Sequence, residues 1–320
     1  MVFSSHLYSL YAHTESQWAG DLWIPEGAER VTGYGSPNVR RRRLAAELRR
    51  LRERAGFIGE EVARRLEWST SKISRLERGQ SGVKRTDLRR LLELYRVDPR
   101  RREELLALAE ESQPSSRLRA ISAGLPEEHA QFLSFEAEAA SVWNWEPQIV
   151  PGLLQTEDYA RAVMLGWHSM FTEPPSELER RVEARRLRQQ VLQREPPLQL
   201  SVVMDESVLY RKLGEASVMR AQLQHIVAAS RLPNIRVRIL PLKSNNPVTT
   251  GAFTYLKFPQ LHDVALNDIV TSEYMTGTDQ FEDQDETFKY SVAFQALEKS
   301  SLDLGQSREK LARVATEEWG

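Results

Sequence analysis

The most constraining feature of the sequence is a series of three short helical patterns between residues 40 and 79, separated by breaks of only a few residues. The third pattern, LEWSTSKISRLERG, has a narrow apolar stripe of Ile73 and Leu76 on an otherwise polar surface. A helix that is mostly hydroxyl-bearing and cationic is too polar for a core element. The pattern therefore predicts a small helical domain in which one polar helix faces a partner.

Local signals mark where these helices begin and end. Apolar residues at helical spacing predict a first helix from Arg40 to about Gly56 and a short second helix around Val62. Ser69 occupies the N-cap position of the third helix, and Gly79 follows its end. Three such helices, with a tight turn between the second and third, are typical of the helix-turn-helix motif.

Turn signals and composition divide the chain into four segments. Residues 1–38 have no sustained period, which predicts a poorly ordered extension. Residues 39–111 form the helix-turn-helix domain, whose fourth helix is expected to start at a Thr86-Asp87 cap and stop before Pro99. Residues 112–126 form a linker rich in proline and serine. Residues 127–320 form a domain of helices and antiparallel strands, so the expected fold class is α+β.

The second domain alternates between helical and strand-like patterns. Helices are expected at residues 132–143, 156–168, 176–195, 217–231 and 285–300, and after residue 305. Strands are expected at residues 198–204, 235–242, 251–258 and 264–274, where β-branched and aromatic residues recur between turn signals.

Charge is distributed unevenly along the chain. The whole sequence has a net charge of −1, yet residues 40–102 hold 21 Lys and Arg against 9 Asp and Glu, a net charge of +12. This asymmetry predicts that the helical domain meets a polyanion and that the acidic remainder does not. A charged helical surface alone is more often only solvated, so the charge supports the helix pattern rather than replacing it.

Several classes of protein are excluded or disfavoured. With no cysteine there is no disulfide, thiolate zinc site or cysteine nucleophile. The histidines form no metal-binding spacing, and phosphate-loop and nucleophile-elbow motifs are absent from the sequence. No apolar run approaches the roughly 18 residues of a membrane span, and the N-terminus lacks secretory-signal features. We expect a cytoplasmic protein that is not an enzyme, needs no cofactor or metal and does not meet a membrane.

A helix that lies in the major groove explains the odd composition of the third pattern. Base edges are read by hydrogen-bond donors and acceptors, and arginine forms a bidentate pair with guanine. The expected base-reading residues are Thr70, Ser71, Lys72, Ser74 and Arg75. The expected phosphate-contacting residues, which position the domain without reading sequence, are Arg40, Arg41, Arg42, Arg43, Gly59, Ser69, Arg78, Lys84 and Arg85.

The stretch GEEVARRLEWSTSKISRLERG resembles the phage-repressor-like (Xre) class of helix-turn-helix regulators. The recognition helix of that class has the form S-x-S-x-I-S-x-x-E followed by glycine. The resemblance implies that Glu77 helps to fix the end of this helix. It also implies a capping threonine and a phosphate-binding glutamine before the second helix, where this sequence has Ile58 and Gly59. Isoleucine cannot cap a helix, although the bare N–H groups there can still face a phosphate.

A second resemblance begins at EAEAASVWNWEPQIVPGLLQTEDYARAVM and covers about residues 135–320. This string is similar to the domain of uncharacterised function that follows Xre-type domains in many actinobacterial regulators of the antitoxin-like Scr type and the WhiJ type. It implies a sensor or partner-binding domain. The candidate residues of a ligand or partner site are Trp145, Pro151, Gly152, Gln155 and Tyr159. The competing interpretation is structural, with a Pro-Gly turn followed by a helix that Thr156 caps, and with aromatic residues in the core.

Two functions from different classes follow. The first is a transcriptional regulator that binds double-stranded DNA as a homodimer, since one module reads only a half-site, while its acidic domain senses a small molecule or a partner protein. The second is an antitoxin-like protein that sequesters a small protein encoded nearby and uses DNA binding for autoregulation. An enzyme with a DNA-targeting module is a third possibility without a supporting motif.

Overall fold

The structure is a computed structural model that describes residues 37–110, 127–168, 175–249, 251–259, 266–274 and 277–320. The predicted linker and all but the last two residues of the predicted extension lie outside these residues. Within the described residues, no helix has both the length and the apolar character needed to cross a membrane.

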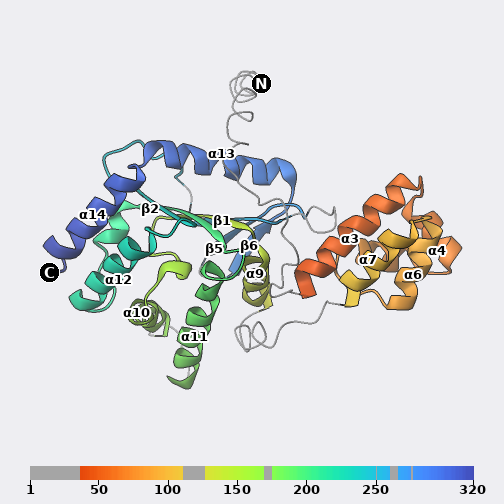
Figure 1. The fold of residues 1–320 in the computed structure, drawn as a ribbon, viewed down its shortest axis with the longest axis horizontal. Helices are drawn as coiled ribbons and strands as arrows, with labels where there is room; N and C mark the ends of the chain where they lie inside the picture. The colour runs from red at the N-terminus through yellow and green to blue at the C-terminus, as the bar shows by residue number, and fades with distance from the viewer. Residues whose placement is uncertain (1–36, 111–126, 169–174, 250, 260–265, 275–276) are drawn as a thin grey trace, which may run out of the picture. The chain divides into compact units, whose positions relative to one another are not determined.

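Residues 37–110 form a helical region, with the predicted helix-turn-helix at its centre (Figure 1). Its helices are α3 (Pro37–Arg54), α4 (Gly59–Leu66), α5 (Thr70–Glu77), α6 (Arg85–Leu94) and α7 (Pro99–Glu110). The apolar stripes identified in the sequence meet in one core. Leu48 from α3, Val62 from α4, Ile73 from α5, Leu88 from α6 and Leu105 from α7 are all buried there. The predicted helix order and inward faces of this region are confirmed.

The turn between α4 and α5 depends on a left-handed residue that is not glycine. Glu67 has φ 58°, and the backbone N–H of Trp68 donates to the carbonyl of Ala63 at 2.8 Å, which closes the end of α4. Ser69 then caps α5, since its hydroxyl accepts the backbone N–H of Lys72 at 3.2 Å. Two residues at the end of one helix and one cap at the start of the next therefore set the angle between the two helices.

The start of α6 differs from the prediction. The helix begins at Arg85, with Lys84 as an N-cap that makes no side-chain cap hydrogen bond. Asp87, expected in the cap, instead forms an ion pair with Lys72 at 2.8 Å. The helix ends at Leu94, and Arg96, with φ 56°, turns the chain toward α7. The carboxylate of Asp87 thus pairs with a residue of another helix instead of capping its own.

The remaining described residues form a mixed domain around a six-stranded sheet (Figure 1). Its helices are α9 (Glu127–Glu138), α10 (Glu157–His168), α11 (Pro175–Arg188), α12 (Ala216–Ala229), α13 (Gln284–Ser300) and α14 (Leu304–Glu317). Its 3₁₀ turns are η1 (Gly152–Leu154), η2 (Gln189–Leu192) and η3 (Glu206–Leu209). Its strands are β1 (Ser141–Glu146), β2 (Gln199–Asp205), β3 (Ile235–Leu240), β4 (Phe253–Lys257), β5 (Ile269–Tyr274) and β6 (Gly277–Phe281).

The α+β class is confirmed, but the sheet is mixed rather than antiparallel. Its strand order is β3-β2-β1-β4-β5-β6, in which β1–β2 and β2–β3 are parallel and the other pairs are antiparallel. The connections from β1 to β2 and from β2 to β3 contain helices α10, α11 and α12, which are long enough to return the chain in the same direction. The first three residues of the central strand β1, 141–143, were expected to end a helix, and that expectation is wrong.

The sheet separates two apolar cores. On one face, α13 covers Trp145, Phe253 and Tyr255 with Phe294 and Leu297 (Figure 1). On the other face, α9, α10, α12 and α14 pack against the opposite sides of the same strands. The alternation of side chains along β1 therefore sends its two tryptophans to one core and Val142 to the other.

Any side chain at Gly79 should destabilise the folded protein. Its φ is 66°, and a Cβ there would lie 3.2 Å from Cγ and 3.4 Å from Cα of Arg42. We expect Gly79→Ala to lower the free energy of unfolding by about 1 to 2 kcal/mol. The control is Gly82→Ala in the same loop, where a Cβ meets nothing within 4 Å. The two variants are compared by urea denaturation, and an equal, small effect of both would contradict the account of this turn.

Candidate functional site

Helix α5 is held by one side and leaves the other exposed. Ile73 and Leu76 are buried in the helical core, as the sequence predicts. Thr70, Ser71, Ser74 and Arg75 are exposed. The Ser71 hydroxyl lies 3.0 Å from that of Ser69. The Nε atom of Arg75 is 3.4 Å from the carbonyl oxygen of Ser71 on its own helix, a long contact that a base edge or phosphate can displace.

Lys72 departs from the other predicted base-reading residues. Its Nζ atom forms the ion pair with Asp87 and lies 3.6 Å from the centroid of the Trp68 ring. The side chain is half-buried by these contacts. The structure therefore uses Lys72 to tie α5 to α6, and reading a base would require both contacts to break.

An ion pair fixes the other end of α5. Nε and Nη2 of Arg52 on α3 donate to the two carboxylate oxygens of Glu77 at 2.7 and 3.0 Å. Both side chains are nearly buried, with exposed fractions of 13% and 12%. Arg52 also donates to the carbonyl of Phe57 at 2.8 Å, just after α3. Arg52 is a residue that the sequence analysis missed, because nothing local in an arginine-rich helix distinguishes one arginine from the next.

The predicted phosphate-contacting residues fall into two groups. Ser69, Arg78, Lys84 and Arg85 are exposed around α5 and the start of α6. Gly59 is half-buried as the first residue of α4, and Ile58 before it makes no side-chain cap, as expected. The residues of this first group lie at the ends of α5, at the start of α4 and at the start of α6.

The arginines of α3 behave differently. Arg43 is 1% exposed and donates to the carbonyl of Pro259 at 2.9 Å. Arg42 forms an ion pair with Glu282, and Arg41 is half-buried. The side chain of Arg40 lies outside the described residues. Arg43 is thus not presented to a phosphate in this structure, because a buried donor must satisfy its hydrogen bonds inside the protein.

The VPGLLQ stretch is a network of internal hydrogen bonds. The Gln155 amide donates to the carbonyl of Val150 at 2.7 Å and accepts from Nη1 of Arg185 at 3.0 Å. The Gln189 amide donates to the carbonyls of Gly152 and Gln155 at 3.0 and 2.6 Å. The polar atoms of this motif therefore hold α11 and η2 against η1.

A third glutamine and a tyrosine complete the network. Gln222 on α12 donates to the carbonyl of Leu154 and accepts the N–H of Thr156, both at 2.7 Å. The Tyr159 hydroxyl accepts the N–H of Val150 at 3.2 Å. The Thr156 hydroxyl accepts the N–H of Tyr159 at 3.4 Å, in the expected capping position.

The five predicted ligand-site residues do not converge. Trp145 is buried between the sheet and α13, whereas Tyr159 belongs to the core on the opposite face. Gly152 is needed for packing, since a Cβ there would lie 2.7 Å from Nη1 of Arg185. The structure separates Trp145 from Tyr159, with which it was grouped together with Pro151, Gly152 and Gln155, because the period of two along β1 places its tryptophans on the far side of the sheet.

Two family models match the chain. A model described as "Helix-turn-helix domain" matches residues 43–105. A model described as "Domain of unknown function (DUF5753)" matches residues 129–313, more than half of the chain. The chain belongs to the DUF5753 family. No curated protein and no solved structure matches it. The helix-turn-helix match supports a DNA-binding regulator.

The DUF5753 domain contains a cluster of charges, around the buried Glu136, that the sequence analysis did not identify. Arg188 forms an ion pair with Glu136, and Nη1 of Arg188 would lie 3.3 Å from a Cβ at Gly152, beside Nη1 of Arg185. Burial, and then the charge of Glu273, raise the pKa of Glu146 to about 8, although a hydrogen bond with Asn144 opposes them. These groups come from β1, β5, α9 and α11, so no local pattern could have joined them.

The position of α5 should depend on Glu77. Glu77→Gln leaves the nearly buried Arg52 without a carboxylate, and we expect the free energy of unfolding to fall by about 1 to 3 kcal/mol. Glu53→Gln is the control, because Glu53 lies 3.6 Å from the same arginine but is 52% exposed. It should change stability by less than about 0.5 kcal/mol. Urea denaturation of both variants tests this, and similar losses would contradict the role given to Glu77.

The raised pKa of Glu146 predicts a pH-dependent gain from Glu146→Gln. The folded wild type holds a proton between about pH 5 and 8 that the unfolded chain has released, so wild-type stability falls as pH rises through this window. Glutamine stays neutral, so the variant should gain on the wild type by up to about 1.4 kcal/mol per pH unit. Unfolding at pH 5, 6.5 and 8 measures the difference. A constant difference across this range would contradict the buried, protonated state.

Proposed function

We propose that the protein is a sequence-specific transcriptional regulator of the Xre type whose α5 lies in the major groove of DNA. The observation that carries this proposal is the two-sided character of α5. Its apolar side is buried, its start is capped by Ser69, and its outer face exposes Ser71, Ser74 and Arg75. Exposed hydroxyl and guanidinium groups on one side of a helix match the donors and acceptors that base edges present in the major groove.

Sequence is read mainly by Arg75 in this proposal. Its guanidinium group matches the two acceptors of guanine, and the serines accept or donate at several bases with little discrimination. Arg78, Lys84 and Arg85 flank the helix and contact phosphates, which set position and orientation. The net charge of +12 over residues 40–102 supplies a sequence-independent attraction to DNA.

The regulator acts as a homodimer in this proposal. One helix-turn-helix module covers only a half-site, and two-fold pairing supplies both affinity and the spacing between half-sites.

The DUF5753 domain supplies the signal. We infer that it binds a partner protein or a small molecule, as the resemblance to Scr-type and WhiJ-type regulators implies. The alternative is an antitoxin-like protein that sequesters a small partner and regulates its own gene. Copurification with a small protein encoded nearby favours the alternative, whereas a protein that binds only operator and small molecule favours the regulator.

Arg75→Ala should remove the preference for specific DNA. We expect affinity for the protein's own upstream DNA to fall by about 1 to 3 kcal/mol, while affinity for random DNA changes little. The matched control is Arg100→Ala on α7, where the arginine is 91% exposed and forms an ion pair with Glu104 at 3.4 Å. Fluorescence anisotropy at two salt concentrations measures both affinities.

Specific, steeply salt-dependent binding that is lost in Arg75→Ala but kept in Arg100→Ala supports the proposal. Unchanged specific binding in Arg75→Ala would contradict the role of Arg75. A wild-type protein with no preference for its own upstream DNA at either salt concentration would move the partner-sequestering alternative to first place.

A further inference from the structure

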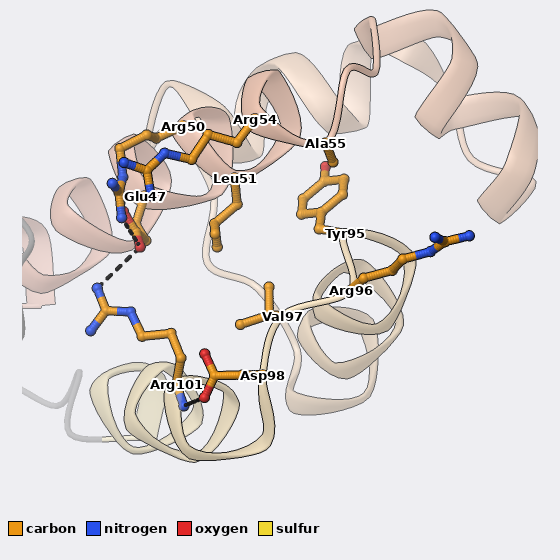
Figure 2. Close-up of a pocket in the computed structure, with 10 residues that line it drawn as sticks. All are labelled: Glu47, Arg50, Leu51, Arg54, Ala55, Tyr95, Arg96, Val97, Asp98 and Arg101. Atoms are coloured by element: carbon orange, nitrogen blue, oxygen red, sulfur yellow. Dashed lines mark hydrogen bonds and ion pairs between the residues drawn. The ribbon is translucent and has the colours of Figure 1, made fainter.

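An open pocket of about 530 Å³ lies in the helical region, between α3 and the segment that joins α6 to α7 (Figure 2). Its inner wall is apolar and is formed by Leu51, Ala55, Tyr95 and Val97. Figure 2 shows the side chains of Leu51, Tyr95 and Val97 directed into the space between the helices. The left-handed turn at Arg96 separates α6 from α7 here. The volume lies within the range of small-molecule sites.

The pocket is cationic on one side. Its lining holds four arginines against Glu47 and Asp98, and Glu104 pairs with Arg101 at 2.9 Å from outside the lining, which leaves an excess of one positive charge. Nε and Nη2 of Arg50 donate to the carboxylate of Glu47 at 2.7 and 2.8 Å, and Arg101 donates to it at 3.0 Å (Figure 2). Burial acts to raise the pKa of Glu47, but the hydrogen bonds from these two arginines outweigh it and hold the pKa below its ordinary value. Glu47 is therefore ionised and fully used by its partners.

Two other charged residues of the lining, Asp98 and Arg54, do not pair with each other, so the pocket can accept a further anion. Asp98 accepts the backbone N–H of Arg101 at 3.0 Å, which caps the start of α7. Arg54 is exposed at the end of α3, and its side chain makes no hydrogen bond or ion pair with any residue that the structure describes. An acidic group beside Arg50, Arg54 and Arg101 would balance the excess charge, while an apolar body would cover the inner wall.

The pocket lies away from the proposed DNA contacts but is linked to the reading helix. Lys84 directly precedes the start of α6, whereas Tyr95 follows its end, and a helix of 10 residues is about 15 Å long. A ligand in the pocket thus leaves the phosphate contact at Lys84 open. Tyr95 is also linked to the Arg52–Glu77 ion pair that holds the end of α5, because its ring centroid lies 6.4 Å from that of Phe57, whose carbonyl accepts a hydrogen bond from Arg52.

We propose that this pocket binds a small organic anion with an apolar body, whose carboxylate, sulfonate or phosphate group lies beside Arg50, Arg54 and Arg101 and whose apolar part packs against Leu51, Tyr95 and Val97. The proposal deepens the proposed function by placing a ligand site within the DNA-binding region itself, and only its effect on DNA rests on that function. Such a ligand contacts Tyr95, which is connected through Phe57 to Arg52, and so biases how firmly α5 is held.

The probe is 8-anilinonaphthalene-1-sulfonate, a fluorescent aromatic sulfonate, titrated into the folded full-length chain. We expect saturable binding that weakens about tenfold in Arg54→Glu, because charge reversal opposes the sulfonate. Arg54→Ala should weaken it less, and serves if the reversal unfolds the protein. Arg89→Glu, an exposed arginine of α6 outside the pocket, is the matched control and should bind within about twofold of wild type.

Equal binding of the probe by wild type and both Arg54 variants would overturn the proposal, as would the absence of saturable binding by the wild type. DNA binding is measured separately, with the wild type, Arg75→Ala and its control Arg100→Ala. A wild-type protein that lacks saturable probe binding but keeps DNA specificity contradicts the pocket alone, whereas a wild-type protein that binds the probe but has no DNA preference contradicts the proposed function alone.

Discussion

The helical region depends on the ion pair between Arg52 and Glu77. It is nearly buried, bidentate, and joins the first helix of the motif to the end of the helix proposed to read DNA. Ser69 fixes the start of the same helix, so α5 is held at both ends and along its apolar side. Its outer face is then free to carry polar groups that contribute nothing to the core. This explains why a helix with so many serines and arginines is stable. Its stability comes from the cap at its start, the ion pair at its end and the buried apolar residues along one side, rather than from the helix propensity of its other residues.

The DUF5753 domain uses polar groups in the opposite way. The side chains of three glutamines form hydrogen bonds with backbone groups of one short loop, namely Gln155, Gln189 and Gln222. Without them, these backbone groups would be buried without partners. The motif that looks most distinctive in the sequence is therefore a structural joint between helices and sheet. The charges around Glu146 form a second feature of this domain. Burial raises the pKa of the Glu146 carboxyl group, so that it stays protonated near neutral pH.

The sequence was sufficient where structure is local. The caps, inward faces and order of the three helices of the motif follow from spacing alone, because each depends on residues within one or two turns. It was insufficient where partners are distant. The first three residues of strand β1 were predicted to end a helix because they follow a helical pattern directly, and only pairing with β2 and β4 makes them part of a strand. The placement of Trp145, the burial of Arg43 and the pairing of Lys72 with Asp87 were missed for the same reason.

The central claim is that α5 reads DNA sequence as part of a symmetric pair. Its most direct test is selection of bound DNA by the full-length protein from a random pool at near-physiological salt, followed by sequencing. The account predicts enrichment of a motif with two related half-sites about one helical turn, or roughly 10 base pairs, apart. Enrichment of no motif, with binding that depends on salt but not on sequence, would contradict it.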